Sequence, residues 1–293
     1  MVAVEPGSRR VTAGLLATPL LWLTLFFLIP VGFIAAYSIG AIHVLPTDPK
    51  VISFEDWHHF LIGDSIYLGL FWKSVRVSLV VSISVVLLAY PVGYFLALCV
   101  KKRKYVLLLV IIAPFLTSYL LRVLAWKVIL GNRGVINSLL FDLHIRSPGD
   151  PVSWLIYSQF AVMLVLVYVW VPFVALPIFV TLESLDRRLF EAATDLGASR
   201  WQTFRRVTLP LSLPGVIAGF LFVFIPTLGE FVTPSLVGGA SGYMYGNQIV
   251  DLFGTGFPDW QTGSVLALFL LGVVALLTIV FSRFLQTREV TAG

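Results

Sequence analysis

Charged residues are scarce in this sequence. Of its 293 residues, 12% are charged and 58% are hydrophobic, whereas a soluble domain carries roughly 25% charged residues. The net charge of +5 comes from short basic clusters between apolar runs, so the basic character does not indicate binding to nucleic acid. The composition excludes an ordinary soluble protein and indicates an integral membrane protein.

Cysteine and the common catalytic motifs are also nearly or wholly missing. Cys99 is the single cysteine, which excludes a disulfide or a thiolate metal cluster within the chain. The sequence contains no GxxxxGK[ST] phosphate loop, no GxSxG nucleophile elbow and no HExxH zinc motif. His58 and His59 are adjacent, so they point to different sides of a helix rather than into one metal site. We therefore expect no catalytic residue, bound metal or cofactor in this chain.

Long apolar runs are what the sequence has instead. Five runs without a charged residue are long enough to cross ~30 Å of hydrocarbon. A sixth contains only Arg122 and Lys127, close to its far end, where long basic side chains reach the interface. We predict an all-α protein with six transmembrane helices in a single domain, 1–293. The predicted spans are 13–37, 77–100, 105–130, 154–180, 211–237 and 262–284.

The positions of lysine and arginine predict the orientation in the membrane. Placing the N-terminus in the cytoplasm also places most of the 20 basic residues there, as the positive-inside rule requires. Both termini are then cytoplasmic. The first run, 13–37, is longer than the apolar region of a signal peptide, which spans roughly 7–15 residues, so we expect an uncleaved span.

One cytoplasmic segment, 183–210, is rich in charge and has strong helix signals. Asp186 is placed to cap a helix whose apolar positions recur at helical spacing, and Gly197 supplies a left-handed residue to end it. Ser199 and Gln202 then form a capping box, and Pro210 is expected to stop the second helix before the fifth span. We predict a helix, a glycine corner and a second helix, and call 183–210 the charged loop.

Two roles fit an amphipathic loop of this kind. A basic amphipathic helix commonly rests on lipid headgroups. Here, however, Glu191 and Asp195 flank the small residues Ala192 and Ala193, which allow another protein surface to approach closely. Docking onto a protein partner is the better explanation.

The charged loop resembles a known family. The order of Glu191, Ala192, Ala193, Gly197, Leu209 and Pro210 is similar to the EAA loop of permease subunits in bacterial ABC importers. The stretches APFLTSYLLRVLAWKVILGNRGVIN (113–137) and LGEFVTPSLVGG (228–239) resemble the spermidine/putrescine class of these permeases.

The resemblance implies a type I importer permease in the bacterial inner membrane. Its partners would be a cytoplasmic ABC ATPase dimer, a second permease subunit of different sequence and an extracytoplasmic substrate-binding protein, with ATP and Mg²⁺ held by the ATPase. The resemblance assigns coupling to the ATPase to the following residues: Glu191, Ala192, Ala193, Asp195, Gly197, Leu209 and Pro210.

The fifth span carries an acid and several helix-breaking residues. Glu230 is its one acid, four residues after Pro226, which is expected to kink the middle of the helix. Counted along straight helices, Glu230 lies ~28 Å beyond the start of its span and Arg122 lies ~26 Å along the third span. Both are therefore expected near the outer mouth. Gly215 and Gly219 form a GxxxG pair, which permits close helix packing.

Two interpretations of Glu230 compete. It pairs with Arg122 between the third and fifth spans, or it faces the transport path and attracts a cationic substrate. Aromatic faces would assist the second role through cation–π attraction. The candidates are Tyr119, Trp126, Tyr243 and Tyr245.

We expect import of a small cationic solute, most specifically a polyamine such as spermidine or putrescine. This expectation rests mainly on the family resemblance. Another small solute, such as an amino-acid derivative, an opine or an aminophosphonate, is the nearest alternative. A channel or secondary carrier that needs no ATPase is a rival from another class, against which the charged loop argues, and an intramembrane enzyme is the last.

Overall fold

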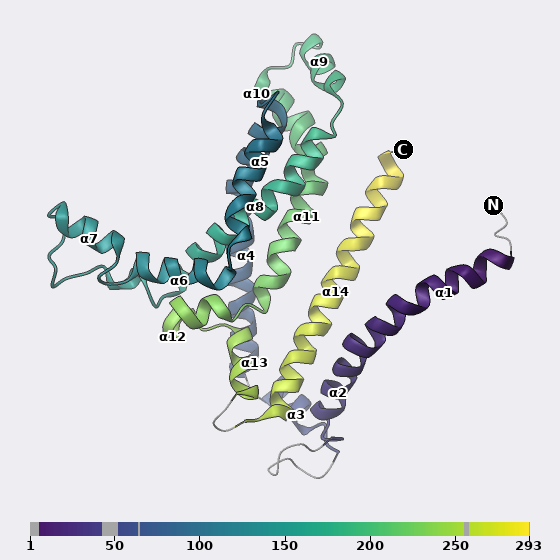
Figure 1. Ribbon diagram of the computed structural model, residues 1–293, viewed down its shortest axis with the longest axis vertical. Coiled ribbons are helices and arrows are strands. Elements are labelled where there is room, and N and C mark those ends of the chain that lie inside the picture. The colour runs from purple at the N-terminus through teal and green to yellow at the C-terminus, as the bar shows by residue number, and fades with distance from the viewer. Residues whose placement is uncertain (1–5, 43–51, 64, 255–257, 293) are drawn as a thin grey trace. The chain divides into compact units, whose positions relative to one another are not determined.

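The protein is helical throughout the part that the structure describes. The computed structural model describes the backbone of residues 6–42, 52–63, 65–254 and 258–292, and this part contains helices, turns and loops but no strand (Figure 1). The predicted all-α class is confirmed. Of the basic residues used to predict orientation, Lys50 and the side chains of Arg9, Arg10, Arg283 and Arg288 lie outside the described set.

The helical elements are numbered in chain order, with η marking 3-10 and π-helical turns. They are α1 (Pro6–Leu23), η1 (Thr24–Leu28), α2 (Ile29–Ser38), α3 (Glu55–His58), η2 (His59–Gly63), α4 (Ser65–Tyr94), η3 (Phe95–Cys99), α5 (Lys104–Ile112), η4 (Ala113–Leu116), α6 (Tyr119–Leu130), α7 (Val135–Asp142), η5 (Ser153–Leu155), α8 (Gln159–Glu183), α9 (Arg187–Asp195), α10 (Arg200–Thr203), η6 (Phe204–Thr208), α11 (Leu209–Leu228), η7 (Pro234–Gly238), α12 (Gly239–Gly242), α13 (Tyr245–Phe253) and α14 (Trp260–Ala292).

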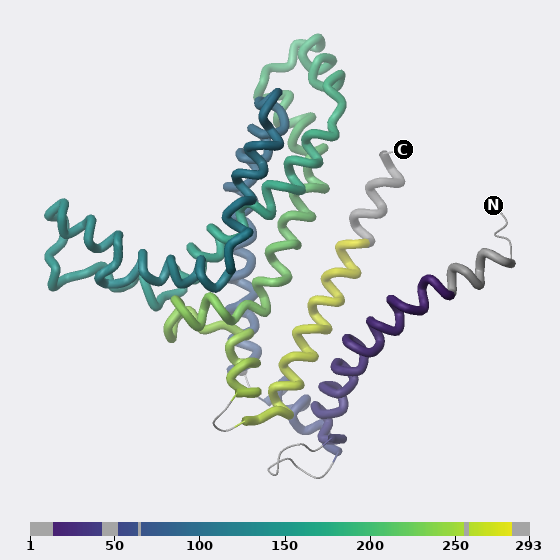
Figure 2. The backbone as a smooth tube through the Cα atoms, viewed as in Figure 1, coloured from purple at the N-terminus to yellow at the C-terminus, as the bar shows by residue number. Residues whose placement is uncertain are grey.

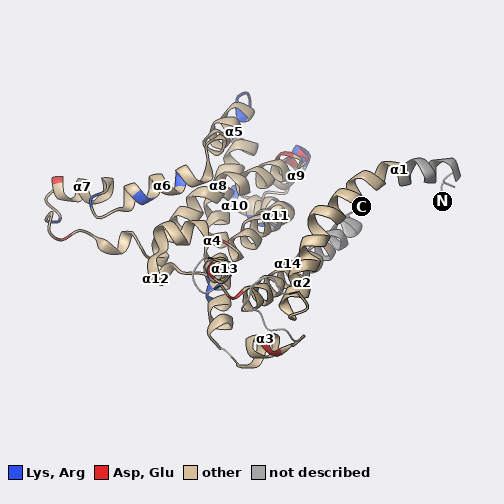
Figure 3. Cartoon of the chain, turned by 60° about the horizontal axis from the view of Figure 1, so that its bottom comes forward, with Lys and Arg blue, Asp and Glu red and all other residues tan. Residues whose placement is uncertain are grey.

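Five continuous helical stretches are long and apolar enough to cross a membrane within the described residues. A bent pair brings the number to six if the pair counts as one span. The five are Gly14–Ser38, Ile66–Cys99, Gln159–Glu183, Arg200–Leu228 and Trp260–Ser282. Charged residues are sparse along these helices and gather at α9 and at the start of α5 (Figure 3).

The predicted third span, 105–130, is not a straight helix. It breaks after η4, and the two halves, Lys104–Leu116 and Tyr119–Asp142, meet at 84° (Figure 2). The backbone is extended at Thr117, with ψ of 153°, and at Ser118, with ψ of 135°, which ends the helix. The expected depth of Arg122, counted along a straight helix, is therefore wrong.

The second span starts earlier than predicted. The residues between the first and second predicted spans contain α3, η2 and the first turns of α4, which begins at Ser65. Lys73 and Arg76 lie inside α4. The predicted span begins after them because it is defined as a run without charged residues, whereas the helix includes both. Lys73 Nζ donates a hydrogen bond to the Tyr243 carbonyl at 2.8 Å, which gives the ammonium a partner inside the protein.

The fifth span differs from the prediction at both ends. Pro210 does not stop the second helix of the charged loop, because α10, η6 and α11 form one helical stretch, Arg200–Leu228. Pro210 stands in the first turn of α11, directly after a π-helical turn, where its missing N–H is tolerated. Pro226 lies two residues before the end of α11, not in the middle of a span that continues to 237.

The chain divides into two compact units, each with its own packing. One unit, 1–68 with 248–279, contains α2, α3 and most of α14. Within it the Phe60 and Phe269 rings meet edge to face at 4.9 Å between centroids, and Trp57 Nε1 donates to Ser38 Oγ at 3.2 Å. The side chains of Gly14–Ser38 are exposed along most of their length, as suits a helix that faces lipid or another subunit.

The other unit, 69–247 with 280–293, contains the charged loop and Glu230. Its centre is the α8–α11 pair. A β-carbon added at Gly215 would lie 2.3 Å from Thr181 Oγ1, and one at Gly219 would lie 2.8 Å from Val174 Cγ1. The GxxxG pair therefore permits the two backbones to approach closely, as small residues do in membrane helices.

We predict that Gly215→Ala destabilises the protein by about 1–3 kcal/mol, because the new methyl group overpacks the α8–α11 interface. The thermal midpoint of the purified protein should fall. Gly69→Ala on α4 is the matched control, since no described atom lies within 4 Å of its new β-carbon, and alanine is the better helix former. Equal midpoints for the two variants would contradict this account of the interface.

Candidate functional site

The charged loop folds with the predicted caps at both helices. Asp186 Oδ1 accepts a hydrogen bond from the Arg188 N–H at 2.9 Å and starts α9. The backbone turns at Gly197, whose φ is +79°. Ser199 and Gln202 then form the capping box that starts α10, with both reciprocal hydrogen bonds present. The predicted helix, glycine corner and helix are all found.

Gly197 is required for its backbone conformation rather than for space. A β-carbon at this position would meet no described atom within 4 Å, whereas a positive φ is unfavourable for most residues with a side chain. The Gly197 N–H donates to the Thr194 carbonyl at 2.9 Å, and the Ala198 N–H donates to the Ala193 carbonyl at 3.0 Å. These bonds satisfy the last carbonyl groups of α9 and fix the angle between the two helices.

Most side chains of α9 are exposed. Glu191, Ala192 and Asp195 are exposed, and so is Leu196, at 89% of its surface. Leu189 and Trp201 add further exposed apolar surface to the loop. A short amphipathic helix held out with its apolar and acidic side chains exposed has the form of a docking element. Leu209 and Pro210 lie apart from this surface, at the start of α11.

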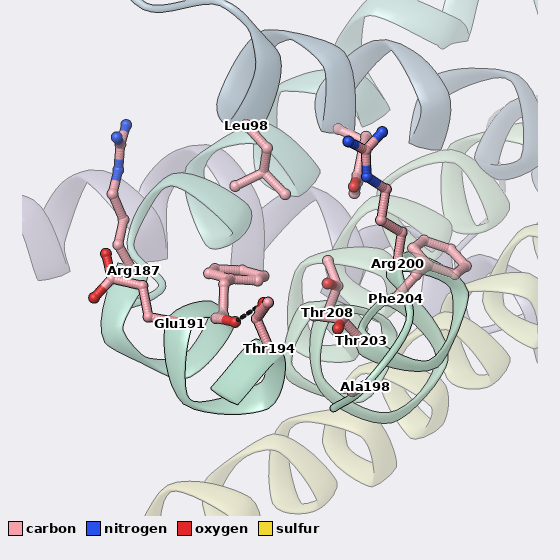
Figure 4. A pocket seen from close by; sticks show the side chains of 11 residues that line it. Leu98, Arg187, Glu191, Thr194, Ala198, Arg200, Thr203, Phe204 and Thr208 are labelled. Atoms are coloured by element: carbon pink, nitrogen blue, oxygen red, sulfur yellow. Dashed lines mark hydrogen bonds between the residues drawn. The ribbon is translucent and has the colours of Figure 1, made fainter. Parts of the chain in front are cut away.

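A cavity of about 470 Å³ lies between α9 and the body of the unit. Figure 4 shows Arg187, Glu191 and Thr194 on the α9 side and Arg200, Phe204 and Thr208 on the other, with Leu98 between them. The side chains of α9 that line the cavity therefore face the body of the unit across it.

The second helix of the loop is firmly attached to the membrane helices. The Phe204 ring in η6 lies 5.9 Å from the rings of both Tyr90 and Tyr94 on α4, measured between centroids. The Tyr90 hydroxyl and Ser212 Oγ are 2.9 Å apart, in hydrogen-bonding contact. The second helix of the loop is therefore packed on α4, and α4 is bonded to α11.

The other candidate site forms where two helices break. We define the Glu230 cluster as Phe115, Tyr119, Arg122, Glu230 and Thr233. Glu230 follows the end of α11, and its Oε1 accepts a hydrogen bond from the Thr233 N–H at 3.0 Å. The Tyr119 hydroxyl is 2.5 Å from Thr233 Oγ1, and Tyr119 interacts electrostatically with both Glu230 and Arg122. Two separate breaks thus meet at one place.

Glu230 and Arg122 do not form an ion pair in this structure. Lys104 pairs with Glu183 and Arg146 with Asp150, so neither of these ion pairs involves Glu230 or Arg122. The Arg122 guanidinium lies over the Phe115 ring, 4.4 Å from its centroid, and its buried Nε has no hydrogen-bond partner among the described residues. Glu230 and Arg122 thus belong to one cluster, but the guanidinium does not form an ion pair with the carboxylate.

Three of the proposed aromatic path residues lie outside this cluster. Tyr245 is fully buried, its ring packs edge to face on Phe71, and burial raises the pKa of its phenol. The backbone carbonyl of Tyr243 accepts a hydrogen bond from Lys73 Nζ. The Trp126 ring packs edge to face on Tyr168 at 5.3 Å between centroids. Tyr119 is the one predicted aromatic residue that the structure places in the Glu230 cluster.

Sequence reasoning missed Thr233 and Asn247, which complete the break after α11. Thr233 joins Glu230 to Tyr119, and the Asn247 Nδ2 donates to the Phe231 carbonyl at 3.0 Å and to Ser235 Oγ at 2.7 Å. Both side chains are buried. Polar residues in an apolar segment could have indicated these roles, since buried polar groups are almost always hydrogen-bonded.

Comparison with known proteins identifies the family. The spermidine/putrescine transport system permease protein PotB of Haemophilus influenzae is 35% identical over 288 residues, which cover 97% of this chain and 96% of the relative. A bacterial ABC transporter involved in the import of the acidic polysaccharide alginate has the same fold, with a TM-score of 0.71 at 19% identity over 96% of each chain.

A second structure of the alginate transporter, in complex with an alginate pentasaccharide-bound periplasmic protein, also matches. Its TM-score is 0.71 at 16% identity, over 97% of this chain and 96% of that one. Residues 4–289 match the family described as "Binding-protein-dependent transport system inner membrane component". This chain belongs to that family and is a multi-pass permease subunit of an ABC importer.

Proposed function

We propose that this permease carries a polyamine, spermidine or putrescine, as one half of a heteromeric translocation channel. The observation that supports this cargo most directly is the 35% identity to a spermidine/putrescine permease over 97% of the chain. The proposed partners are a cytoplasmic ABC ATPase dimer that holds ATP and Mg²⁺, a second permease of different sequence and an extracytoplasmic binding protein. Both termini are proposed to lie in the cytoplasm of a bacterial cell.

The Glu230 cluster offers the chemistry that a polyamine needs. Glu230 uses one carboxylate oxygen to accept the Thr233 N–H, while an ionised carboxylate has about four acceptor positions. Tyr119 interacts with the same carboxylate, and we propose that the acceptor positions left over receive an ammonium group. An amine passing this point would find a charge that Arg122 does not neutralise by direct contact.

The charged loop is proposed to transmit ATP hydrolysis. Its exposed α9 surface would insert into a groove of the ATPase, with Glu191, Ala192, Ala193 and Asp195 at the contact. Gly197 would set the angle of α9, and Leu209 and Pro210 would join the loop to α11. The ring contacts of Phe204 with α4 give this movement a direct route into the membrane helices.

The first experiment measures uptake of radiolabelled spermidine and putrescine into vesicles that carry this chain with its co-purified subunits. We expect uptake only when ATP and the binding protein are present. ATPase activity stimulated by another solute's binding protein, without polyamine uptake, would overturn the cargo and keep the transporter. Uptake without any ATPase subunit would contradict the coupled mechanism.

We predict that Glu230→Gln lowers uptake about tenfold or more, because a hydrogen bond to a charged group contributes ~1.5–3 kcal/mol. The glutamine oxygen can still accept the Thr233 N–H, so the break should keep its structure. Asp142→Asn, at an exposed position on α7, is the control and should transport normally. If Arg122→Gln lowers uptake by the same factor, the result would instead favour an ion pair between Glu230 and Arg122 in another conformation of the transporter.

We predict that Gly197→Val abolishes uptake while the protein still inserts in the membrane. Valine at φ of +79° costs ~1–2 kcal/mol and would turn α9 away from its docking angle. Gly197→Asn should retain most of the uptake, because asparagine tolerates this conformation. Gly149→Val, in a loop where an added β-carbon meets no described atom, controls for residue size. Normal uptake by Gly197→Val would refute the corner's role.

A further inference from the structure

An acid at the junction of α8 with the charged loop is bonded to the start of α5. Glu183 is the last residue of α8, and only 184–186 separate it from α9. Its Oε1 forms an ion pair with Lys104 Nζ and accepts a hydrogen bond from the Tyr105 hydroxyl at 2.9 Å. Lys104 and Tyr105 open α5. We call these three residues the α5–α8 junction.

The Lys104–Glu183 ion pair is more shielded from water than the Arg146–Asp150 ion pair. The side chains of Lys104 and Glu183 are 21% and 25% exposed, whereas those of Arg146 and Asp150 are 48% and 68% exposed and lie in one local turn. Partial shielding from water strengthens an ion pair relative to a fully exposed one. In addition, one carboxylate oxygen receives two donors from successive residues of another helix.

An aromatic contact also joins α5 to α8 at this junction. The Tyr105 ring meets the Phe179 ring edge to face at 6.3 Å between centroids, one helical turn before Glu183 on α8. Lys104 Nζ lies 5.2 Å from the centroid of the Tyr105 ring. The first turn of α5 is thus attached to the last turns of α8 by charge, hydrogen bond and packing together.

The far end of the same segment is attached to the Glu230 cluster. From Lys104 the helix runs through α5 and η4 for ~20 Å at 1.5 Å per residue, and then reaches the break at Thr117 and Ser118. Directly after the break, the Tyr119 hydroxyl contacts Thr233 Oγ1, and the Thr233 N–H donates to Glu230. One short helix therefore connects the base of the charged loop to the break that carries Glu230.

We propose that Lys104, Tyr105 and Glu183 are positioning residues that make α5 and η4 a rigid link between the charged loop and the Glu230 cluster. When α9 moves with the ATPase, the end of α8 moves with it, because the connection 184–186 is short. The α5–α8 junction obliges α5 to follow. At the far end, Thr117 and Ser118 lack α-helical backbone geometry, so the chain can bend there when α5 and η4 are displaced, and this bending changes the position of Tyr119.

This inference depends on the proposed coupling role of the charged loop and not on the identity of the cargo. It is tested by the accessibility of a thiol placed at the break. Ser118 is exposed, and its side chain makes no capping hydrogen bond. Ser118→Cys in a Cys99→Ser background therefore places a reporter there without removing a capping hydrogen bond.

The experiment uses the complete complex with its ATPase and compares maleimide labelling rates without nucleotide and with ATP and vanadate. With the junction intact, we expect the rate at position 118 to change at least about fivefold, the low end of coupling between distant sites. Lys104→Gln should abolish this change while ATP hydrolysis continues. A change that survives in Lys104→Gln, or no change with the junction intact, would overturn the proposal.

Three further variants separate coupling from simple stabilisation. The exchange Lys104→Glu with Glu183→Lys should restore the nucleotide-dependent change, because the ion pair is rebuilt with its charges reversed. Tyr105→Phe keeps the ring and should lose only part of the change. Lys102→Gln removes an exposed neighbouring charge and should have no effect. If Lys104→Gln instead lowers hydrolysis, labelling and thermal stability in proportion, the junction is only structural and the proposal fails.

These outcomes are distinct from a failure of the proposed cargo. Labelling at position 118 requires nucleotide but no transported solute, so an absence of polyamine uptake leaves the test intact. A failure of the coupling role itself is recognised by Gly197→Val. If that variant retains the full nucleotide-dependent change, movement at the break does not come through the charged loop.

Discussion

A helix in hydrocarbon must satisfy its backbone N–H and C=O groups within itself, and this constraint decides where the chain can be irregular. The breaks at 117–118 and 229–231 are clear departures from helix next to apolar spans. At both, side chains provide hydrogen-bonding partners. Thr117 Oγ1 donates to the Pro114 carbonyl, Glu230 accepts the Thr233 N–H, and Asn247 donates to the Phe231 carbonyl. Because Tyr119 and Thr233 are in contact, the two breaks share one set of polar side chains.

The same constraint keeps the other helices of the unit continuous and closely packed. Between the charged loop and the breaks, α8 and the stretch from α10 to α11 are continuous, and their backbones approach closely at Gly215 and Gly219. Close-packed helices of this kind move as bodies rather than deforming, since packed interiors are not continuously deformable. Bending is therefore expected at the ends of these helices, where both candidate sites lie.

Much of this arrangement could be predicted from local sequence, but the parts that depend on tertiary contacts could not. Asp186, Gly197 and the Ser199–Gln202 capping box act over a few residues, and each was found where the sequence placed it. The start of α4 was missed because Lys73 looks like a helix end until its partner, the Tyr243 carbonyl, is known. Tyr245 was expected beside the transport path, yet its burial depends on Phe71, far away in the sequence.

The position of Glu230 follows from the break rather than from the polarity of its neighbours. The helical segment that begins after the break starts with N–H groups that have no intrahelical partner, and the Glu230 carboxylate, three residues before Thr233, satisfies one of them. That role occupies only part of the carboxylate, and Arg122 rests on Phe115 instead of occupying the remainder. Irregular backbone is tolerated at membrane depth where it is buried in protein or lines a water-filled cavity. The residue that stabilises the break is thus also the acid that we propose for contact with a cationic solute.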